Sequence, residues 1–487
     1  MGRGVAGAIR VAALLTVAVL IVDAAVSLWS GVYLNLGTGV WLALARDVHD
    51  GIFYRPIWNG AEYGGTRYFP MLFVPIGALM RLGLPAVHAG VIVSLAGLIA
   101  LVIAVVLLLE RWSVPRPLAL LGGALVAAPY FVHQTGFAVR CEPLAAAFAA
   151  GGLAVLGPPR VDTPPTRRLL VAALLFVCAF ATKITCVYAP AAAVIALLLA
   201  RRTSAALRLA LFTAAGAVIF LAIVHVASDG RALEAFRANA LAGSDPGSLV
   251  GVAALIRPVR LIAGSHILSV VFVLAAAALV PAWRRGGELP VLYLLAAMAV
   301  TAVIFTSPGT IITSQIVDAY TAAIVVLIVA TARSRPPLQA AACAVLIGVA
   351  LWAAAQNAVR IARHVRVDLP PAARDRAALL DALGSCRGSM IAESGMAPIL
   401  AGQRPVILDS FALHVIGLTR PEVTASLVDR ISRTEFECVV LEQDPTTERG
   451  RAWYRNVNLT ADIVRATLQH YRFDRVVAGQ RIYRAVR

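Results

Sequence analysis

Long apolar runs recur through roughly the first three quarters of this chain. Each is about 20 residues long, which is the length an α-helix needs to cross the hydrocarbon core of a bilayer. Hydrophobic residues make up 60% of the chain and charged residues only 14%, whereas a soluble domain carries far more charge. We therefore expect an all-α polytopic membrane domain, because helices satisfy their own backbone hydrogen bonds in lipid. The first run lacks a small-residue cleavage site and is interpreted as a signal anchor.

The runs predict about eleven transmembrane helices, with edges uncertain by a few residues. A further apolar run, 68–83, is short and contains Pro70 and Pro75, so we expect a helix at the outer interface or dipping into it. The eleven expected spans are 9–30, 86–109, 117–133, 144–157, 169–182, 185–200, 206–227, 262–282, 289–306, 313–332 and 337–358.

The net charge of +17 comes from arginines, and Lys183 is the sole lysine. Nucleic-acid binding is rejected, because these arginines occupy mostly short loops between spans or are balanced by acids in the tail. An N-terminus on the inside gives every inner loop at least two arginines, as the positive-inside rule requires. This topology leaves 31–85, 134–143, 228–261 and the tail outside. The inner-loop arginines are Arg3, Arg10, Arg111, Arg116, Arg160, Arg167, Arg168, Arg201, Arg202, Arg208, Arg284, Arg285, Arg333 and Arg335.

Residues 1–366 are expected to form the transmembrane domain, with 31–85 as its first outer loop. Residues 367–487 are expected to form a small extracytoplasmic α/β domain, because strand-like and helix-like segments alternate there. The expected strands are 389–393, 404–408, 437–442, 473–479 and 480–486, and the expected helices are 373–384, 421–433 and 460–470.

Two of the six cysteines, Cys386 and Cys438, lie in the tail beside expected strands. They could form a disulfide in an oxidising compartment, but we favour two unpaired thiols. The others fall in or near spans, and no cysteine pair has zinc-site spacing.

Carboxylates are scarce before residue 368, where 12 of the chain's 26 acids occur. Three of them, Asp47, Asp50 and Glu62, share the first outer loop with Arg67 and Tyr68. A carboxylate in such a loop can take a proton from a hydroxyl or hold a divalent cation. The ordinary alternative is that Asp47 and Asp50 solvate one face of an interfacial helix.

Three further polar features are expected near the same outer face: Arg140 with Glu142, Lys183 between two spans, and Asp318 just inside a span. Arg and Lys can clamp a phosphate and stabilise it as a leaving group. Each feature also has a structural explanation, since Lys183 can snorkel and Asp318 can bond a neighbouring helix. Together, and in this order along the chain, they favour transfer of a group from a lipid phosphate.

The same order resembles the GT-C superfamily of polytopic glycosyltransferases, in the group of protein O-mannosyltransferases and aminoarabinose transferases (family 39-type). The stretch YRPIWNGAEYGGTRYFPMLF (54–73), with Tyr68, Phe69 and Pro70, matches the family's first outer loop. The family's second outer loop has an arginine followed by an acid, as Arg140 and Glu142 here, and a Thr-Lys pair between central spans, as Thr182 and Lys183. Many members also end in an outer α/β domain. The resemblance covers nearly the whole chain.

This resemblance implies a glycosyltransferase of the cytoplasmic (plasma) membrane that moves a hexosyl or pentosyl group from a polyprenyl-phosphate-linked donor. The acceptor would be a lipid, glycan or protein at the outer face. The family's catalytic acid falls on Gly37 and Thr38, which carry no carboxylate, so Asp47 or Asp50 is the expected base. Arg140, Lys183 and Arg67 are expected to bind the donor phosphate. Glu142, Glu62, Tyr68 and Asp318 are expected to support them, and the need for a divalent cation is left open.

Two other classes stay open. A transporter or lipid flippase would carry ionisable residues near the bilayer midplane and an inverted repeat. Within the expected spans we find Asp23 and Asp318 but no repeat. A non-catalytic scaffold is compatible with the vacant acid position at Gly37 and Thr38. An enzyme requires Asp47 or Asp50, Arg140 and Lys183 to surround one outward cavity, whereas a scaffold does not.

Overall fold

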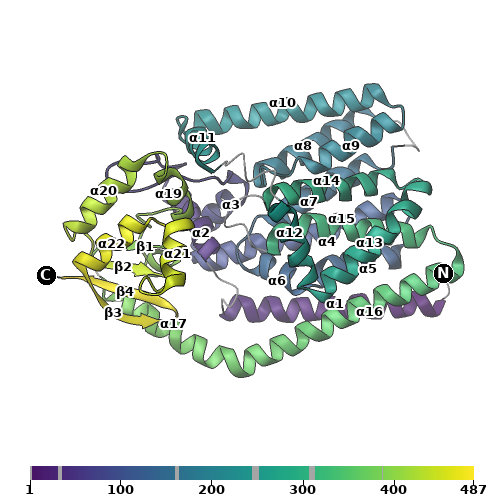
Figure 1. Ribbon diagram of the computed structural model, residues 1–487. Helices are drawn as coiled ribbons and strands as arrows, with labels where there is room; N and C mark the ends of the chain where they lie inside the picture. The colour runs from purple at the N-terminus through teal and green to yellow at the C-terminus, as the bar shows by residue number, and fades with distance from the viewer. Residues whose placement is uncertain are drawn as a thin grey trace.

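The computed structural model describes residues 3–30, 36–159, 164–243, 252–305, 313–386 and 388–486. The chain forms a bundle of long helices and a smaller lobe built around a β-sheet at the C-terminal end (Figure 1). Of the predicted features, Arg160 and positions 306–312 of the short loop before Asp318 lie outside the described residues.

Six helical segments in the described part of the chain are long and apolar enough to cross a membrane. A bent pair, α5 (Arg116–Ala127) and α6 (Tyr130–Phe137), turns by 71° and adds a seventh if it counts as one span. The six involve α1 (Arg3–Ser30), α4 (Ala86–Arg111), α10 (Thr203–Ala227), α13 (His266–Arg284), η2 (Thr313–Ile316) with α15 (Val317–Ala332), and α16 (Pro336–Arg363).

Shorter helices occupy the four remaining predicted spans. They measure 12 to 17 residues, so they do not meet the length requirement alone. A polytopic membrane domain is thus supported, while the number eleven stays a prediction. These helices are α7 (Glu142–Leu156), α8 (Thr166–Thr182), α9 (Tyr188–Leu199) and α14 (Glu288–Ile304).

Small residues determine how tightly the bundle packs. Helix α7 reads EPLAAAFAAGGLAVL and lies between α4 and α8, where alanine and glycine let neighbouring helices approach. A Cβ at Gly152 would come within 2.4 Å of the Phe176 ring of α8, so only glycine fits there. Helix α15 is buried along its whole length, whereas α10 exposes Leu211, Val218 and other apolar side chains on its outer surface.

Two of the regions expected to lie outside, 31–85 and 228–261, are more helical than predicted. The first begins with α2 (Leu36–His49), which was read as loop, and continues with α3 (Pro70–Arg81) inside the predicted 68–83 segment. At 12 residues α3 is about 18 Å long, too short for a ~30 Å core. The second contains α11 (Arg231–Gly243) and α12 (Val252–Ala263).

The C-terminal lobe contains a four-stranded sheet in the order β1-β2-β4-β3. Strands β1 and β2 are parallel, and the other neighbours are antiparallel. The β3–β4 hairpin turns at Ala478 and Gly479, both with positive φ, as a two-residue type I′ turn requires. The strands are β1 (Met390–Ala392), β2 (Cys438–Leu441), β3 (Tyr471–Val477) and β4 (Gln480–Ala485).

Both faces of this sheet are covered at β1 and β2, which explains why these two strands are apolar at every position. Met390, Cys438 and Ile482 point to one face, where they pack against α17 (Leu369–Gly384). Ile391, Val439 and Tyr483 point to the other face, beneath the remaining helices. Those helices include α19 (Ser410–Gly417), α20 (Pro421–Ser432) and α22 (Ala461–His470); α18 (Met396–Leu400) and α21 (Glu448–Asn456) complete the lobe.

The sequence prediction was wrong for the segment 404–408, which joins no strand of this sheet. Ile407 instead forms an isolated bridge with Tyr63 of the first outer loop. Tyr63 donates its backbone N–H to Val406 (2.8 Å), and its carbonyl accepts from Leu408 (3.0 Å). The apolar alternation of RPVIL is thus used to join the lobe to the first outer loop.

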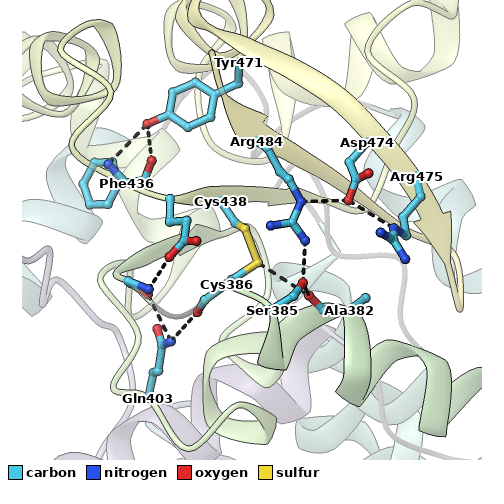
Figure 2. The surroundings of a disulfide bond; sticks show 12 residues. Ala382, Ser385, Cys386, Gln403, Phe436, Cys438, Tyr471, Asp474, Arg475 and Arg484 are labelled. Carbon is cyan, nitrogen blue, oxygen red and sulfur yellow. Dashed lines mark hydrogen bonds and ion pairs between the residues drawn. A yellow bond between two sulfur atoms is a disulfide. The ribbon is translucent and has the colours of Figure 1, made fainter. Parts of the chain in front are cut away.

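The preference for two unpaired thiols was also wrong, because Cys386 and Cys438 form a disulfide (Figure 2). It ties the end of α17 to β2. Around it, the Gln403 amide donates to the carbonyls of Cys386 and Gly388, both at 3.1 Å, and Arg484 bridges Asp474 and Ser385. A disulfide that closes a long chain segment stabilises the fold mainly by restricting the unfolded chain.

Candidate functional site

The first outer loop lies between the helix bundle and the C-terminal lobe, where Figure 1 shows α2 and α3. Gly39 of α2 approaches the backbone of Gly395 and Met396 so closely that a Cβ would lie 2.8 Å from the Met396 nitrogen. Side chains of α2 and α3 form one core that also includes Leu408 of the lobe. The loop and the lobe are therefore firmly joined, and residues from both can contribute to one site.

Asp47 and Arg55 form a buried ion pair at one contact between the loop and the lobe. The guanidinium donates from Nε to one Asp47 oxygen (2.7 Å) and from Nη2 to the other (2.5 Å), and its Nη1 donates to the Pro405 carbonyl (2.6 Å). Glu62 lies 3.6 Å from Arg55 and also binds Arg404 of the lobe. We call these four side chains, Asp47, Arg55, Glu62 and Arg404, the ion-pair joint.

In the ion-pair joint both carboxylate oxygens of Asp47 accept hydrogen bonds from Arg55, which favours a structural role for Asp47. Burial raises the pKa of Asp47 to about 6, although Arg55 acts in the opposite direction. Asp50 lies apart from it at the surface, where it binds His49 (2.7 Å) and Arg46 (3.1 Å). The catalytic role of Asp47 or Asp50 stays a prediction.

Arg140 is held at the start of α7 by its own backbone. Val139 has φ 38°, a strained value for a β-branched residue, and this directs the chain so that the N–H of Arg140 meets Ser94 Oγ of α4 (3.0 Å). Its guanidinium lies against Gly37, where a Cβ would come within 2.5 Å of Nη1. The vacant acid position of the resemblance thus faces Arg140.

Lys183 and Asp318, two candidate residues from distant parts of the sequence, form an ion pair. Lys183 follows the last residue of α8, and its Nζ lies 2.7 Å from Oδ2 of Asp318 in the first turn of α15. The Tyr188 hydroxyl donates to the other oxygen at 2.6 Å. A cation at a helix C-terminus and an anion at a helix N-terminus both match the helix dipoles.

Glu142 begins α7 and adds a second carboxylate to this region. It accepts hydrogen bonds from Ser314 Oγ (2.9 Å) and Gln315 Nε2 (3.5 Å), and its charge is close enough to act on Lys183. Lys183, Asp318, Tyr188, Glu142 and Ser314 form what we call the Lys183 cluster.

Arg67 and Tyr68 occupy a second contact between the first outer loop and the lobe. Arg67 stacks over the Phe411 ring of the lobe at 4.1 Å from its centroid, and over Tyr68 at 5.6 Å. Arg67 remains exposed to solvent at this contact. Tyr68 packs on Trp41 at 4.3 Å between ring centroids and lies within electrostatic reach of Arg140.

The sequence reasoning missed Asp409, which reaches the same contact from the lobe. It lies directly after the segment 404–408, which was predicted to be a strand. Asp409 is 2% exposed, caps α19, and acts electrostatically on Arg67, Tyr68 and Tyr63. We call Tyr63, Arg67, Tyr68, Asp409 and Phe411 the Arg67 recess. A signal was present in the sequence, because an acid before SFALHVIG is typical of a helix N-cap.

An apolar groove runs between α8, α9 and α10, with a volume of about 470 Å³. Cys186 and Val187, a few residues after Lys183, line it, together with Phe176, Phe180 and Ala217. Phe69 of the first outer loop packs on Phe180 at 5.5 Å. The groove therefore connects the lipid-facing side of the bundle to the neighbourhood of the Lys183 cluster.

Among the described residues, no three or more His, Cys, Asp or Glu side chains gather as a group that could hold a metal ion. The acids of the ion-pair joint are instead matched by arginines, and Asp318 is matched by Lys183. The arrangement thus offers cations and single carboxylates for binding an anionic ligand.

No known protein family and no curated protein matches the sequence. Solved structures do: ArnT from Cupriavidus metallidurans superposes with TM-scores of 0.64 in the apo state and 0.61 bound to undecaprenyl phosphate, at 13% identity over 97% of this chain and 97% and 98% of those chains. The archaeal oligosaccharyltransferase AglB from Archaeoglobus fulgidus, in complex with an inhibitory peptide and a dolichol-phosphate, matches at TM-score 0.53 and 11% identity, over 100% of this chain and 74% of its own. The resemblance seen in the sequence is confirmed for the architecture: the chain has the GT-C fold of these polytopic glycosyltransferases.

Proposed function

We propose that this protein transfers a sugar from a polyprenyl-phosphate-linked donor to an acceptor at the outer face of the cytoplasmic membrane. The observation that carries the proposal is the apolar groove that leads to the vicinity of Lys183, with Arg140 and Arg67 on neighbouring elements. A long isoprenoid tail fits an apolar groove, and cations fit the phosphate at its head. The fold shared with ArnT bound to undecaprenyl phosphate supports the same donor class.

In this proposal Lys183 and Arg140 hold the donor phosphate and stabilise it as a leaving group. Lys183 forms an ion pair with Asp318, and the phosphate of a bound donor would contact the same ammonium group. Glu142 and Asp318 orient the cations, and α3 shapes the lipid entrance. The lobe 367–487 contacts the acceptor or closes the site from above.

The proposed topology places the N-terminus inside and the lobe outside. Two observations support it: the inner loops are rich in arginine, and the lobe contains the Cys386–Cys438 disulfide. Disulfides persist in oxidising compartments and are rare in the cytosol.

The test is transfer of radiolabelled sugar from a panel of polyprenyl-phosphate sugars by the full chain in lipid nanodiscs. We expect transfer from at least one donor by the wild-type protein. Absence of transfer from every donor by folded protein would reject the enzyme and favour the scaffold, whereas donor movement across the bilayer without transfer would favour the flippase.

Donor binding by Lys183→Met tests the phosphate contact. We expect a loss of affinity of about 10- to 100-fold, because a hydrogen bond to a charged group contributes about 1.5–3 kcal/mol. The variant Lys183→Met/Asp318→Asn restores charge balance, so it should recover stability without recovering affinity. Arg116→Ala, an exposed cation at the far end of α5, is the matched control. Unchanged affinity in Lys183→Met would remove this residue from the site.

A further inference from the structure

Asp409 is a buried carboxylate with only half of its hydrogen-bonding capacity in use. Its Oδ1 accepts from the backbone N–H groups of Phe411 (3.1 Å) and Ala412 (3.0 Å), which caps α19. Its Oδ2 is inaccessible to solvent and accepts no hydrogen bond from any described residue. A buried charged oxygen without a partner costs more than about 1–3 kcal/mol, so its retention needs a reason.

The Tyr63 hydroxyl beside it is in the same condition. Tyr63 is fully buried, its hydroxyl has no hydrogen-bond partner among the described residues, and Asp409 acts on it electrostatically. The two side chains are fixed relative to each other, because the Tyr63 backbone pairs with Val406 and Leu408 directly before Asp409. Gly65 makes room for this ring, since a Cβ there would lie 2.3 Å from the hydroxyl.

Two buried polar atoms without a hydrogen-bond partner among the described residues therefore lie on segments that pair with each other, and Arg67 stacks on Phe411, whose N–H binds Asp409. Arg67 is exposed to solvent, so we expect a ligand to approach from its side. Tyr68 extends the recess toward Arg140, because it is within electrostatic reach of both Asp409 and Arg140. A ligand that bonds both Asp409 and the Tyr63 hydroxyl would satisfy the recess completely.

We propose that Asp409, contributed by the C-terminal lobe, is the catalytic base of the transfer reaction, and that Tyr63 and Arg67 position it. This inference rests on the proposed function. The acceptor is then a hydroxyl-bearing molecule. Its oxygen forms the bond to the anomeric carbon, the bond from that carbon to the donor phosphate oxygen breaks, and the electron pair leaves with the polyprenyl phosphate. The acceptor proton passes to Oδ2 of Asp409, so atoms and charges balance.

The electrostatics of the recess are consistent with this assignment. Burial raises the pKa of Asp409 above its ordinary value, while Arg67 and the backbone N–H groups of Ala412 and Phe411 lower it. A carboxylate with a raised pKa accepts a proton more readily near neutral pH. Arg67 thus keeps the base ionised, which is a different task from the phosphate contact predicted for it.

The variant that tests the inference is Asp409→Asn in the full chain, measured in nanodiscs with the donor that the wild type uses. Asparagine caps a helix as well as aspartate, so we expect an unchanged melting temperature. We expect kcat to fall about 10²- to 10⁴-fold with the donor KM nearly unchanged, because general-base catalysis contributes that factor. The rise of wild-type kcat with pH should disappear in the variant.

Thr447→Ala is the matched control, because Thr447 caps α21 of the same lobe through Gly450 and lies on the exposed surface. It should lower stability by about 1 kcal/mol and leave kcat close to wild type. If Asp409→Asn does not fold, Asp409→Ser supplies an alternative cap, and added formate should restore part of its rate if a carboxylate is missing.

The outcomes separate the inference from the proposed function. Wild-type transfer with a fully active Asp409→Asn variant overturns the inference and leaves the function standing. Transfer that is lost in Asp47→Asn but kept in Asp409→Asn returns the base to the first outer loop. Absence of wild-type transfer rejects the function and the inference together.

Discussion

The first outer loop meets the C-terminal lobe at two places. Each contains a buried aspartate and an arginine, but the hydrogen bonding of the aspartate differs. In the ion-pair joint, Asp47 is 1% exposed and Arg55 occupies both of its oxygens. In the Arg67 recess, Asp409 is 2% exposed, and one oxygen has no hydrogen bond among the described residues. Burial is the same in both, so burial alone does not distinguish a structural carboxylate from one that is available to a ligand.

The two contacts differ in whether all of their polar atoms have hydrogen-bond partners. A fully bonded polar network fixes geometry, because each member would lose a partner if the two parts moved apart. A network with unused atoms gives up stability and is retained where a ligand completes it. The ion-pair joint therefore holds the lobe in place, and the Arg67 recess uses that fixed placement. The following three changes test the distinction.

The largest effect is expected from Arg55→Ala in the ion-pair joint. It leaves the Asp47 carboxylate buried without a partner, which should destabilise the protein by about 3–5 kcal/mol. Thermal unfolding of the full chain measures this, with Arg433→Ala, an exposed arginine of the lobe, as control. Replacing both charges, Arg55→Met with Asp47→Leu, should recover most of the loss. An Arg55→Ala protein as stable as the wild type would contradict the assigned role of this joint.

An intermediate effect is expected at Glu442, where the same contrast occurs inside the lobe. Its neighbour Glu393 is saturated by Trp453, Tyr454, Asn458 and the backbone N–H of Glu442. Burial and, to a smaller extent, the charge of Glu393 raise the pKa of Glu442 to about 7, against the hydrogen bond from Gln480, which lowers it. The folded protein thus keeps a proton that the unfolded chain releases, so stability should fall as pH rises from the ordinary glutamate pKa to about 7.

Glu442→Gln removes this titration. Above pH 7 the free energy of unfolding of the variant should exceed that of the wild type by about 1–3 kcal/mol, and the difference should shrink as the pH approaches 5. Melting temperatures across this range measure it, with the exposed Asp462→Asn as control. A variant that follows the wild-type pH curve would show that Glu442 is already ionised in the fold.

The smallest effect is expected from Glu62→Gln, at the solvent-facing edge of the ion-pair joint. Glu62 is 17% exposed and Arg404 36%, so their ion pair should contribute no more than about 1 kcal/mol. A double-mutant cycle with Arg404→Ala isolates the pair. A coupling energy as large as that of Asp47 with Arg55 would mean that the Glu62–Arg404 pair is as well shielded from solvent as the buried pair.

Much of the architecture could be predicted from the sequence, because apolar run length and arginine placement are local signals. Helices occupy every predicted span, and α3 lies where Pro70 and Pro75 excluded a full crossing. The strands flanking the disulfide were also predicted. Helices α2, α11 and α12 were not, since they are short and gain their stability from packing: α2 and α11 pack against both the bundle side and the lobe, and α12 packs against α13 and α14.

The candidate site was only partly predictable, because it depends on contacts between distant segments. The residue types were correctly singled out for Lys183 and Asp318, which meet across 135 positions. The pairing of Asp47 with Arg55, eight residues away, was not predicted, and Asp409, which directly follows the predicted strand 404–408, was not singled out. The segment 404–408 has strand character but pairs with Tyr63, and no local pattern specifies a pairing partner outside the domain.

Helix α16 passes through the π-turn η3 (His364–Asp368) directly into α17, so one nearly uninterrupted helical path runs from the bundle to the lobe (Figure 1). The length of such a path sets the distance and the rotation of the lobe relative to the bundle. One added residue in α16 would raise the lobe by about 1.5 Å and rotate it by about 100°. A rotation of that size is incompatible with the ion-pair joint and the Tyr63–Ile407 bridge, which hold the lobe against the first outer loop. The number of residues in this helical path must therefore match the placement of the lobe that those contacts fix.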